Sequence, residues 1–374
     1  MNISKLVRWF SGKRQSAYAS PDAVAVEESQ AALRQLSLER LMAYGVHHPD
    51  AVELRARVWS GERWQDVATD LAETCLAPPE RHVAPETAVT RRNRLFRASA
   101  LLRMSQMMML SNSPERTAIF VRAGKAFEEA AALGGDRRRM TIDTKNGRLA
   151  GWLYPSVGPA IGRAVVIGGI EGWAMDFGEM GLELARRGVE ALLLDGPGQG
   201  ESRFIHEHYL RPGWEASYYS VFDLMERLEP RLPFGFIGNS MGGSVAMHLA
   251  AREPRIAACC DNGGPLDPGR ARASSMMLKV AAHVGDVTPE FAIEVWKSIV
   301  AVDPAKPVTC PLLVVHGGQD PLVSTEDAEA IFGSGKGMDT SMVEYSDGDH
   351  CVYNHADDKH ALICDWMASR LGAR

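Results

Sequence analysis

The sequence predicts an α/β protein in which an all-helical N-terminal domain precedes a mostly parallel sheet. Two observations carry this prediction. Before residue 137, apolar residues recur at helical spacing and strand signals are few. After Asp136, short apolar runs typical of buried strands alternate with helix-like stretches, which is the pattern of a parallel sheet covered on both faces. We therefore expect a helical cap domain over 1–137 and a sheet domain over 138–374.

The N-terminal part contains helical patterns and one well-marked helix start. Ser113 followed by Pro114 is a cap with proline at the first helical position, and the helix that it opens should stop at Gly134 and Gly135. Four methionines lie just before this cap, and they serve either as core filler or as a pliable pocket wall. They are Met104, Met107, Met108 and Met109.

The strands of the second part are expected as an opening hairpin followed by six buried runs. The hairpin is predicted at 140–144 and 148–154, and the runs at 164–167, 189–194, 234–237, 256–261, 311–315 and 341–345. Residues 265–304 lie between two of these strands, where a short helical lid is expected. The glycine-rich stretch 195–200 lacks the Lys-Ser/Thr ending of a phosphate loop and is predicted to be a tight turn.

Composition excludes several classes of protein. The 374 residues carry a net charge of −6, so no basic field is available to attract nucleic acid. No apolar run approaches the length of a membrane span, and the first ten residues are too broken for a secretory signal. Six cysteines without CxxC spacing indicate reduced core residues of a cytoplasmic protein.

The most informative segment is Gly-Asn-Ser-Met-Gly-Gly at 238–243. It follows the apolar run 234–237 and precedes a helix-like stretch at 244–253. A serine hydroxyl is a poor nucleophile unless the chain presents it to a base on a tight strand-to-helix turn, and the flanking glycines make such a turn feasible. The pattern alone is also typical of a plain glycine-rich turn. Between a strand and a helix it predicts a nucleophile elbow with Ser240 as the nucleophile.

A serine nucleophile requires a histidine base and an orienting acid, and in this fold the order along the chain is serine, acid, histidine. Asp320 follows the strand predicted at 311–315, and His350 lies in the loop after the strand predicted at 341–345. We therefore expect Asp320 as the acid and His350 as the base. The alternatives are a helix-capping aspartate and a loop histidine with no catalytic role.

Rival residues exist for two of these roles. Asp303 and Asp327 are other carboxylates nearby, but neither directly follows a strand. Cys351 is a second candidate nucleophile, although the elbow already supplies one. These alternatives remain open at the level of the sequence.

An oxyanion hole is expected from the loop after the strand at 164–167. That loop reads Gly-Gly-Ile-Glu-Gly, and the amides of Ile170 and Met241 are the natural donor pair. Glu171 is unusual there, because a carboxylate about 5 Å from a forming oxyanion costs about 3 kcal/mol at an effective dielectric near 20. If it faces the site, it should be protonated, neutralised by a cationic substrate, or moving a proton. The alternative is a solvent-facing glutamate at a helix start.

Four segments together resemble a known family. They are Asp-Gly-Pro-Gly-Gln-Gly-Glu at 195–201, the elbow, Glu-Pro-Arg-Ile-Ala-Ala at 253–258 and Asp-Gly-Asp-His-Cys at 347–351. In these the chain resembles the 2,6-dihydroxypseudooxynicotine hydrolases, within a wider group that includes fermentation/respiration switch esterases and polyketide chain-shortening hydrolases. Asn239, Met241 and the stretch after Gly264 depart from that pattern, so substrate identity is not carried over.

The resemblance implies an α/β-hydrolase fold and carbon-carbon bond hydrolysis through Ser240, Asp320 and His350, with Glu171 as an additional catalytic glutamate. It also implies a homodimer. The expected substrate is a small ketone or diketone with an aromatic or polyketide-like part, and the expected role of Glu171 is proton transfer to the leaving group. The alternatives are an esterase, lactonase or thioesterase, or a non-hydrolytic cyclase or acyltransferase.

Side chains that would line the pocket are less constrained. Aromatic density at 203–221 and in the lid suits a ring-bearing substrate, although packing against the N-terminal domain explains it as well. The candidates are Trp173, His206, Tyr218, Tyr219, Met276 and Trp296. His206 and His208 have no third ligand in view, so neither a metal nor another cofactor is expected.

Overall fold

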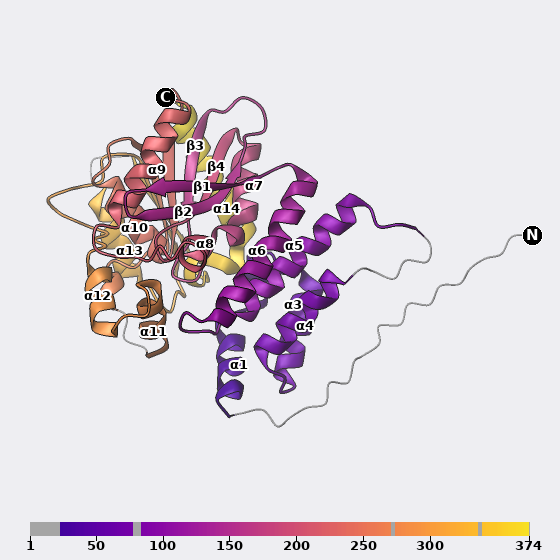
Figure 1. Ribbon diagram of the computed structural model, residues 1–374. Helices are drawn as coiled ribbons and strands as arrows, with labels where there is room; N and C mark the ends of the chain where they lie inside the picture. Colours follow the sequence, from indigo (N-terminus) through magenta and orange to yellow (C-terminus); the bar gives the residue numbers. More distant parts are fainter. Residues whose placement is uncertain (1–22, 78–83, 271–273, 336–338, 374) are drawn as a thin grey trace, which may run out of the picture.

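The computed structural model describes residues 23–77, 84–270, 274–335 and 339–373. The predicted absence of a signal segment concerns the first ten residues, which lie outside these ranges. Figure 1 shows a sheet with helices on both of its faces and a group of N-terminal helices packed to one side.

Helices alone make up the described chain up to Gly134, and the first strand begins at Arg138. The helices are α1 (Ala23–Gln35), α2 (Leu38–Ala43), α3 (His48–Trp59), α4 (Trp64–Leu76), α5 (Ala88–Ser105) and α6 (Pro114–Gly134). The predicted start of α6 is confirmed, since the Ser113 side chain accepts from the Arg116 amide and Pro114 is the first helical residue. Gly135 ends the helix with a left-handed φ of 67°, a conformation that glycine adopts without strain.

The sheet has eight strands in the order β1-β2-β4-β3-β5-β6-β7-β8. They are β1 (Arg138–Thr144), β2 (Gly147–Tyr154), β3 (Gly162–Ile167), β4 (Val189–Asp195), β5 (Phe234–Asn239), β6 (Ile256–Asn262), β7 (Leu312–Gly317) and β8 (Thr340–Tyr345). The predicted hairpin of β1 and β2 is antiparallel, β2 pairs antiparallel with β4, and all the remaining pairs are parallel. The expectation of a mostly parallel sheet is confirmed.

Helices cover both faces because successive side chains of the central strands point to opposite sides. Val165 packs with the core that α9 and α10 cover, whereas its neighbour Val166 packs with the core under α7 and α14. The helices and 3-10 turns of this part are η1 (Ala174–Phe177), α7 (Gly178–Arg186), α8 (Gly200–Phe204), α9 (Glu215–Leu228), α10 (Met241–Ala250), η2 (Pro268–Arg270), α11 (Ser274–His283), α12 (Pro289–Lys297), α13 (Thr325–Ser334), η3 (His350–His355) and α14 (Ala356–Gly372).

The segment expected to form a lid carries η2, α11 and α12. It connects β6 to β7, and its helices pack against the core under α9 and α10 through Val280, Ile293 and Trp296. The stretch at 195–200 is the tight turn that was predicted, since Gly198 has a φ of 82° and the Gln199 amide donates to the Gly196 carbonyl.

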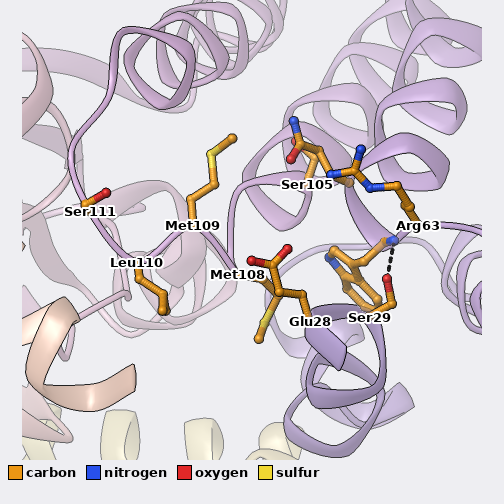
Figure 2. Close-up of a pocket in the computed structure, with 10 residues that line it drawn as sticks. Glu28, Ser29, Arg63, Ser105, Met108, Met109, Leu110 and Ser111 are labelled. Carbon is orange, nitrogen blue, oxygen red and sulfur yellow. Dashed lines mark hydrogen bonds between the residues drawn. The ribbon is translucent and has the colours of Figure 1, made fainter. Parts of the chain in front are cut away.

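The methionines before α6 divide between two surroundings. Met104 and Met107 are buried in the helical core. Met108 and Met109 line a pocket of about 310 Å³ that Figure 2 shows between α1, the start of α4 and the segment after α5. Its other lining residues are Glu28, Ser29, Arg63, Trp64, Gln65, Ser105, Leu110 and Ser111. Both interpretations of the cluster therefore apply, to different members.

Candidate active site

Ser240 lies on the turn between β5 and α10, at the carboxyl edge of the parallel strands. Its backbone has φ 55° and ψ −132°, a conformation that L residues rarely adopt. The Ser240 amide donates to the Asn262 carbonyl at 2.9 Å, and the Gly243 amide donates to the Ser240 carbonyl at 2.7 Å. These two bonds hold the strained residue in place between the strand and the helix.

Three glycines let the turn form, because backbone passes where a side chain would stand. A Cβ on Gly238 would lie 2.0 Å from the Gly242 carbonyl oxygen, and one on Gly242 would lie 2.4 Å from the Gly168 oxygen. A Cβ on Gly169 would lie 2.7 Å from the Cβ of Ser240 and 3.0 Å from its hydroxyl. The loop after β3 is therefore pressed directly against the serine.

The predicted acid and base lie within hydrogen-bonding distance of each other and of the serine. His350 Nε2 is 2.8 Å from Ser240 Oγ, and His350 Nδ1 is 2.8 Å from Asp320 Oδ2. The other oxygen of Asp320 accepts from the amides of Leu322 at 2.7 Å and Val323 at 3.1 Å. An imidazole held in this way presents Nε2 to the hydroxyl, as a general base requires.

The surroundings shift the pKa values of both groups. Burial raises the pKa of Asp320, but the hydrogen bonds from His350 and from the amides of Leu322 and Val323 lower it by more. The net pKa is below the ordinary value, so the carboxyl is ionised. Burial lowers the pKa of His350, but the hydrogen bond to the Asp320 carboxylate and the charge of that carboxylate raise it, and the net pKa lies above that of an ordinary histidine. The imidazole is thus a stronger base than an ordinary histidine.

The rival residues lie elsewhere or are engaged. Asp303 accepts from Arg252 at 3.1 Å, and Asp327 lies 3.5 Å from Arg270. Cys351 is buried and its thiol donates to the Asn262 carbonyl at 3.4 Å. Neither Asp303 nor Asp327 has a hydrogen bond to Ser240 or His350 within the described residues.

The two amides expected to hold an oxyanion belong to the segments that meet at Ser240. Met241 is the first residue of α10, where the helix leaves its amide without an intrahelical partner. Ile170 follows Gly169, the residue in contact with the serine. In the described part of the chain, neither amide donates a hydrogen bond to another protein group.

Glu171 is buried and ionised, which corrects two of the expected states. Its Oε2 accepts from Arg116 Nη2, and its Oε1 lies 3.9 Å from Arg203 Nη1. Burial raises the pKa of the carboxyl, but Arg116, Lys279 and Arg203 lower it below its ordinary value. The side chain is therefore neither protonated nor in need of a cationic substrate, because the protein supplies the counter-charges itself.

Sequence reasoning missed Arg116, Arg203 and Lys279. Arg116 lies in the first turn of α6, Arg203 on α8 and Lys279 on α11, so they come from three distant segments. No motif marks them, and only the packing of these helices against the loop after β3 brings them together. Asn262 was missed too; its side chain donates to Asn239 Oδ1 at 2.7 Å and its carbonyl holds the Ser240 amide.

The predicted lining residues are scattered around this centre. Trp173 is buried edge-on between Phe120 and Phe204, and Trp296 is edge-on to His283. Tyr218 packs in the core against Trp214 and Phe236, Tyr219 against Phe222, and Met276 is half-buried on α11. His206 Nε2 lies 3.4 Å from Glu201 Oε1. Contact with a substrate remains a prediction for all six.

Two further statements apply to residues 23–77, 84–270, 274–335 and 339–373. No group of three or more His, Cys, Asp or Glu side chains there is arranged to hold a metal ion. None of the helices in these ranges has the length and apolar character that crossing a bilayer demands.

Comparison with known proteins yields relatives along most of the chain. It is 26% identical over 342 residues to the 2,6-dihydropseudooxynicotine hydrolase of Paenarthrobacter nicotinovorans, covering 89% of this chain and 91% of that protein. The crystal structure of the 2,6-dihydroxy-pseudo-oxynicotine hydrolase superposes with a TM-score of 0.76 at 25% identity, over 90% of this chain and 96% of the other. AbyA5, at 17% identity and a TM-score of 0.62, covers 82% of this chain and 92% of its own and shares the fold.

A family model adds the classification. The model described as the alpha/beta hydrolase family matches residues 168–361, more than half of the chain. The match spans the loop after β3, the elbow and the loops that carry Asp320 and His350. With the sheet order described above, these findings show that the chain belongs to the α/β-hydrolase family and is a hydrolase.

Proposed function

We propose that the protein is a serine hydrolase that breaks a carbon-carbon bond of a ketone or diketone with an aromatic or polyketide-like part. The observation that carries the proposal is the hydrogen-bonded chain from Asp320 through His350 to Ser240, with 2.8 Å at each step. What the family resemblance implies for the bond cleaved agrees with it, and the relative of 26% identity extends over the helical part as well as the sheet.

In the proposed reaction His350 Nε2 takes the proton of Ser240 as Oγ bonds to the carbonyl carbon. The carbonyl oxygen becomes an oxyanion, which the amides of Ile170 and Met241 stabilise. The oxyanion collapses, the carbon-carbon bond breaks, and the departing carbon keeps the electron pair as an enolate. The imidazolium of His350 returns its proton to that carbon, which leaves a neutral ketone and an acyl-enzyme.

Water completes the cycle. His350 takes a proton from the water as its oxygen bonds to the acyl carbon, and the Ser240 oxygen leaves with that proton. The sum is one diketone and one water giving one carboxylic acid and one ketone. No cofactor is needed to balance the reaction.

The proton-transfer role predicted for Glu171 is revised in this proposal. An ionised carboxyl with a lowered pKa has no proton to give, so the leaving carbon is protonated by His350. Glu171 instead acts as the counter-ion that orients Arg116 beside the loop carrying Ile170.

The first test is covalent labelling. A fluorophosphonate should label the wild-type protein and fail to label Ser240→Ala, and the substitution should lower turnover by at least about a thousandfold, since members of such a triad act as a unit. Unchanged labelling of Ser240→Ala would show that another residue is the nucleophile.

The second test identifies the bond. With 1-phenylbutane-1,3-dione, chromatography should find benzoate with acetone, or acetate with acetophenone, in equal amounts. Cleavage of 4-nitrophenyl acetate without any loss of the diketone would favour the alternative of an esterase, lactonase or thioesterase. A product formed without consumption of water would favour a cyclase or acyltransferase.

The state of the protein in the cell is a further part of the proposal. A homodimer in the cytoplasm, acting on a small molecule and not on nucleic acid, is what the resemblance and the composition favour. Light scattering of the purified chain measures the mass directly, and a monomer would contradict the dimer.

A further inference from the structure

Four charged side chains meet beside the loop that touches Ser240, and they form what we call the Arg203 cluster. They are Arg116 from α6, Glu171 from the loop after β3, Arg203 from α8 and Lys279 from α11. Their exposed fractions are 0%, 7%, 1% and 8% respectively. Figure 1 shows α6 and α8 side by side, where the N-terminal helices approach the sheet.

The cluster carries more positive than negative charge. Glu171 is the one carboxylate of the four, against two guanidinium groups and one ammonium. Burial lowers the pKa of Arg203 to about 10 and also lowers that of Lys279, while Glu171 raises both. At neutral pH Arg203 stays charged, so a net positive charge is enclosed in the interior, where the cost of an uncompensated ion is high.

The hydrogen bonds of the two arginines differ. Arg116 donates from Nε to Gln106 Oε1 at 2.6 Å and from Nη2 to Glu171. Arg203 donates from Nε to Asn112 Oδ1 at 2.7 Å, but its two buried Nη atoms have no hydrogen-bond partner in the part of the chain that the structure describes. The nearest carboxylate oxygen, Glu171 Oε1, lies 3.9 Å from Nη1 and is itself without a hydrogen bond.

Such an arrangement is unusual because buried donors are almost always paired. Other polar atoms nearby are in the same state. Among the described residues, both ring nitrogens of His283 lack a hydrogen-bond partner, and so does Trp173 Nε1. Burial, together with the charge of Arg203, lowers the pKa of His283 to about 3, so the ring is neutral and adds no charge. Unpaired donors therefore outnumber unpaired acceptors here, and the one unpaired carboxylate oxygen, Glu171 Oε1, lies beyond hydrogen-bonding distance of Arg203 Nη1.

The start of the helix that carries Arg203 is hydrogen-bonded to the loop beside the nucleophile. Gln199, which precedes α8, donates from Nε2 to the carbonyls of Gly168 at 2.6 Å and Gly169 at 2.7 Å. Gly169 is the residue pressed against Ser240, and Ile170 follows it. The backbone that carries Arg203 is thus tied to the loop that contacts Ser240.

We infer that the Arg203 cluster is an anion subsite that binds a negatively charged oxygen of the substrate, either a carboxylate or an ionised enol. This inference rests on the proposed function and specifies its substrate class. A guanidinium presents two parallel N–H groups to such oxygens. Hydrogen bonds between charged groups of this kind are stronger than those between neutral groups. An enolate leaving from the broken bond carries its charge on the same kind of oxygen.

The experiment measures binding without turnover, in the Ser240→Ala protein, by calorimetry. The probes are 2,4-dioxo-4-phenylbutanoate and its methyl ester, which share the diketone and the ring and differ by one carboxylate. We expect the acid to bind at least about tenfold more tightly than the ester, and Arg203→Gln to remove that difference. Arg227→Gln, a change at an exposed arginine on α9, should leave it intact.

Each outcome has one meaning. A preference for the acid that Arg203→Gln abolishes assigns a carboxylate to the subsite. Equal binding of the two probes, with both weakened at least about tenfold by Arg203→Gln, assigns the ionised enol. Equal binding that Arg203→Gln leaves unchanged overturns the inference and leaves water as the partner of the guanidinium.

Two further measurements keep the test decisive. If Arg203→Gln does not fold, Arg203→Lys retains the charge but loses the paired donors and should reduce the preference for the acid. Thermal shifts of Ser240→Ala with each probe give the preference without any change at Arg203. Fluorophosphonate labelling separates the two proposals, since labelled Ser240 with no discrimination between the probes refutes the subsite alone.

Discussion

The hydrogen-bonded chain at Ser240 and the Arg203 cluster share the loop after β3, yet they differ in how completely their polar atoms are paired. Asp320 accepts three hydrogen bonds and His350 uses both ring nitrogens. Two buried nitrogens of Arg203 and one oxygen of Glu171 have no hydrogen-bond partner among the described residues, although the two side chains lie 3.9 Å apart. The polar atoms of the first group are paired within the protein. Those of the second leave buried donors that, in our inference, an anionic substrate pairs.

This difference indicates that the chain at Ser240 determines the reaction and that the Arg203 cluster determines the choice of substrate. A preorganised triad serves any carbonyl that reaches it, because its groups act on the reacting atoms alone. An unsatisfied charge selects among substrates, because only a ligand with the complementary charge removes the cost of leaving it unpaired. Changes in the two places should therefore have separable effects on kcat and KM.

The largest effect is expected from Asp320→Asn. The amide still reaches His350 but holds the imidazole in the wrong tautomer, so kcat should fall by about ten thousandfold. Stopped assays with the acid and ester probes should show the same loss for both. A loss confined to the acid probe would mean that Asp320 acts on the charge of the substrate. It would contradict the separation of roles between the chain at Ser240 and the Arg203 cluster.

The next effect is that of pH on kcat/KM for 4-nitrophenyl acetate, which carries no group that ionises in this range. His350 must be neutral to accept the serine proton, and its pKa is raised above that of an ordinary histidine. The rate should therefore rise by about tenfold per pH unit below that pKa and level off above it. The pKa of Lys279 is lowered, so this lysine loses its proton and its positive charge in alkaline solution. The KM for the negatively charged acid probe should then rise. A flat profile from pH 6 to 9 would contradict the raised basicity of the imidazole.

The smallest effect on turnover is expected from Glu171→Gln. The change removes the counter-ion of Arg116 and should cost about 3 kcal/mol of folding stability, as is typical when one partner of a buried ion pair is lost. The added positive charge should tighten binding of the acid probe and leave the ester probe unaffected. Denaturant unfolding and calorimetry measure the two quantities.

A control separates that result from a catalytic role. Surface Glu226→Gln removes a carboxylate from an exposed ion pair with Arg255 and should change neither quantity measurably. If Glu171→Gln instead lowers kcat on 1-phenylbutane-1,3-dione while sparing 4-nitrophenyl acetate, then Glu171 moves a proton after all.

Much of the fold, and the three side chains that form the hydrogen-bonded chain at Ser240, could be predicted from the sequence. The strand runs, the cap at Ser113 and the turn at 238–243 are local signals, because each depends on spacing between near neighbours. Asp320 and His350 could be found because each directly follows a strand, and the carboxyl ends of parallel strands meet at one edge of the sheet.

The Arg203 cluster could not be predicted in the same way. Its members contact one another across segments up to 163 residues apart, from Arg116 to Lys279, and each alone is typical of a solvent-exposed helix residue. The sequence suggests only the substrate as a counter-charge for Glu171. The three cations that lie beside this carboxylate come together only when the chain folds.

The three residues after His350 are divided between two hydrophobic cores. Cys351 and Tyr353 are buried with the N-terminal helices, and Val352 between them is buried under α14. Cys351 and Val352 both have left-handed backbones, with φ of 59° and 56°, and Tyr44 of the helical part donates to the Tyr353 hydroxyl at 3.0 Å. Removal of residues 1–137 should therefore disturb the position of His350, because the segment that directly follows it packs against the helices that would be lost.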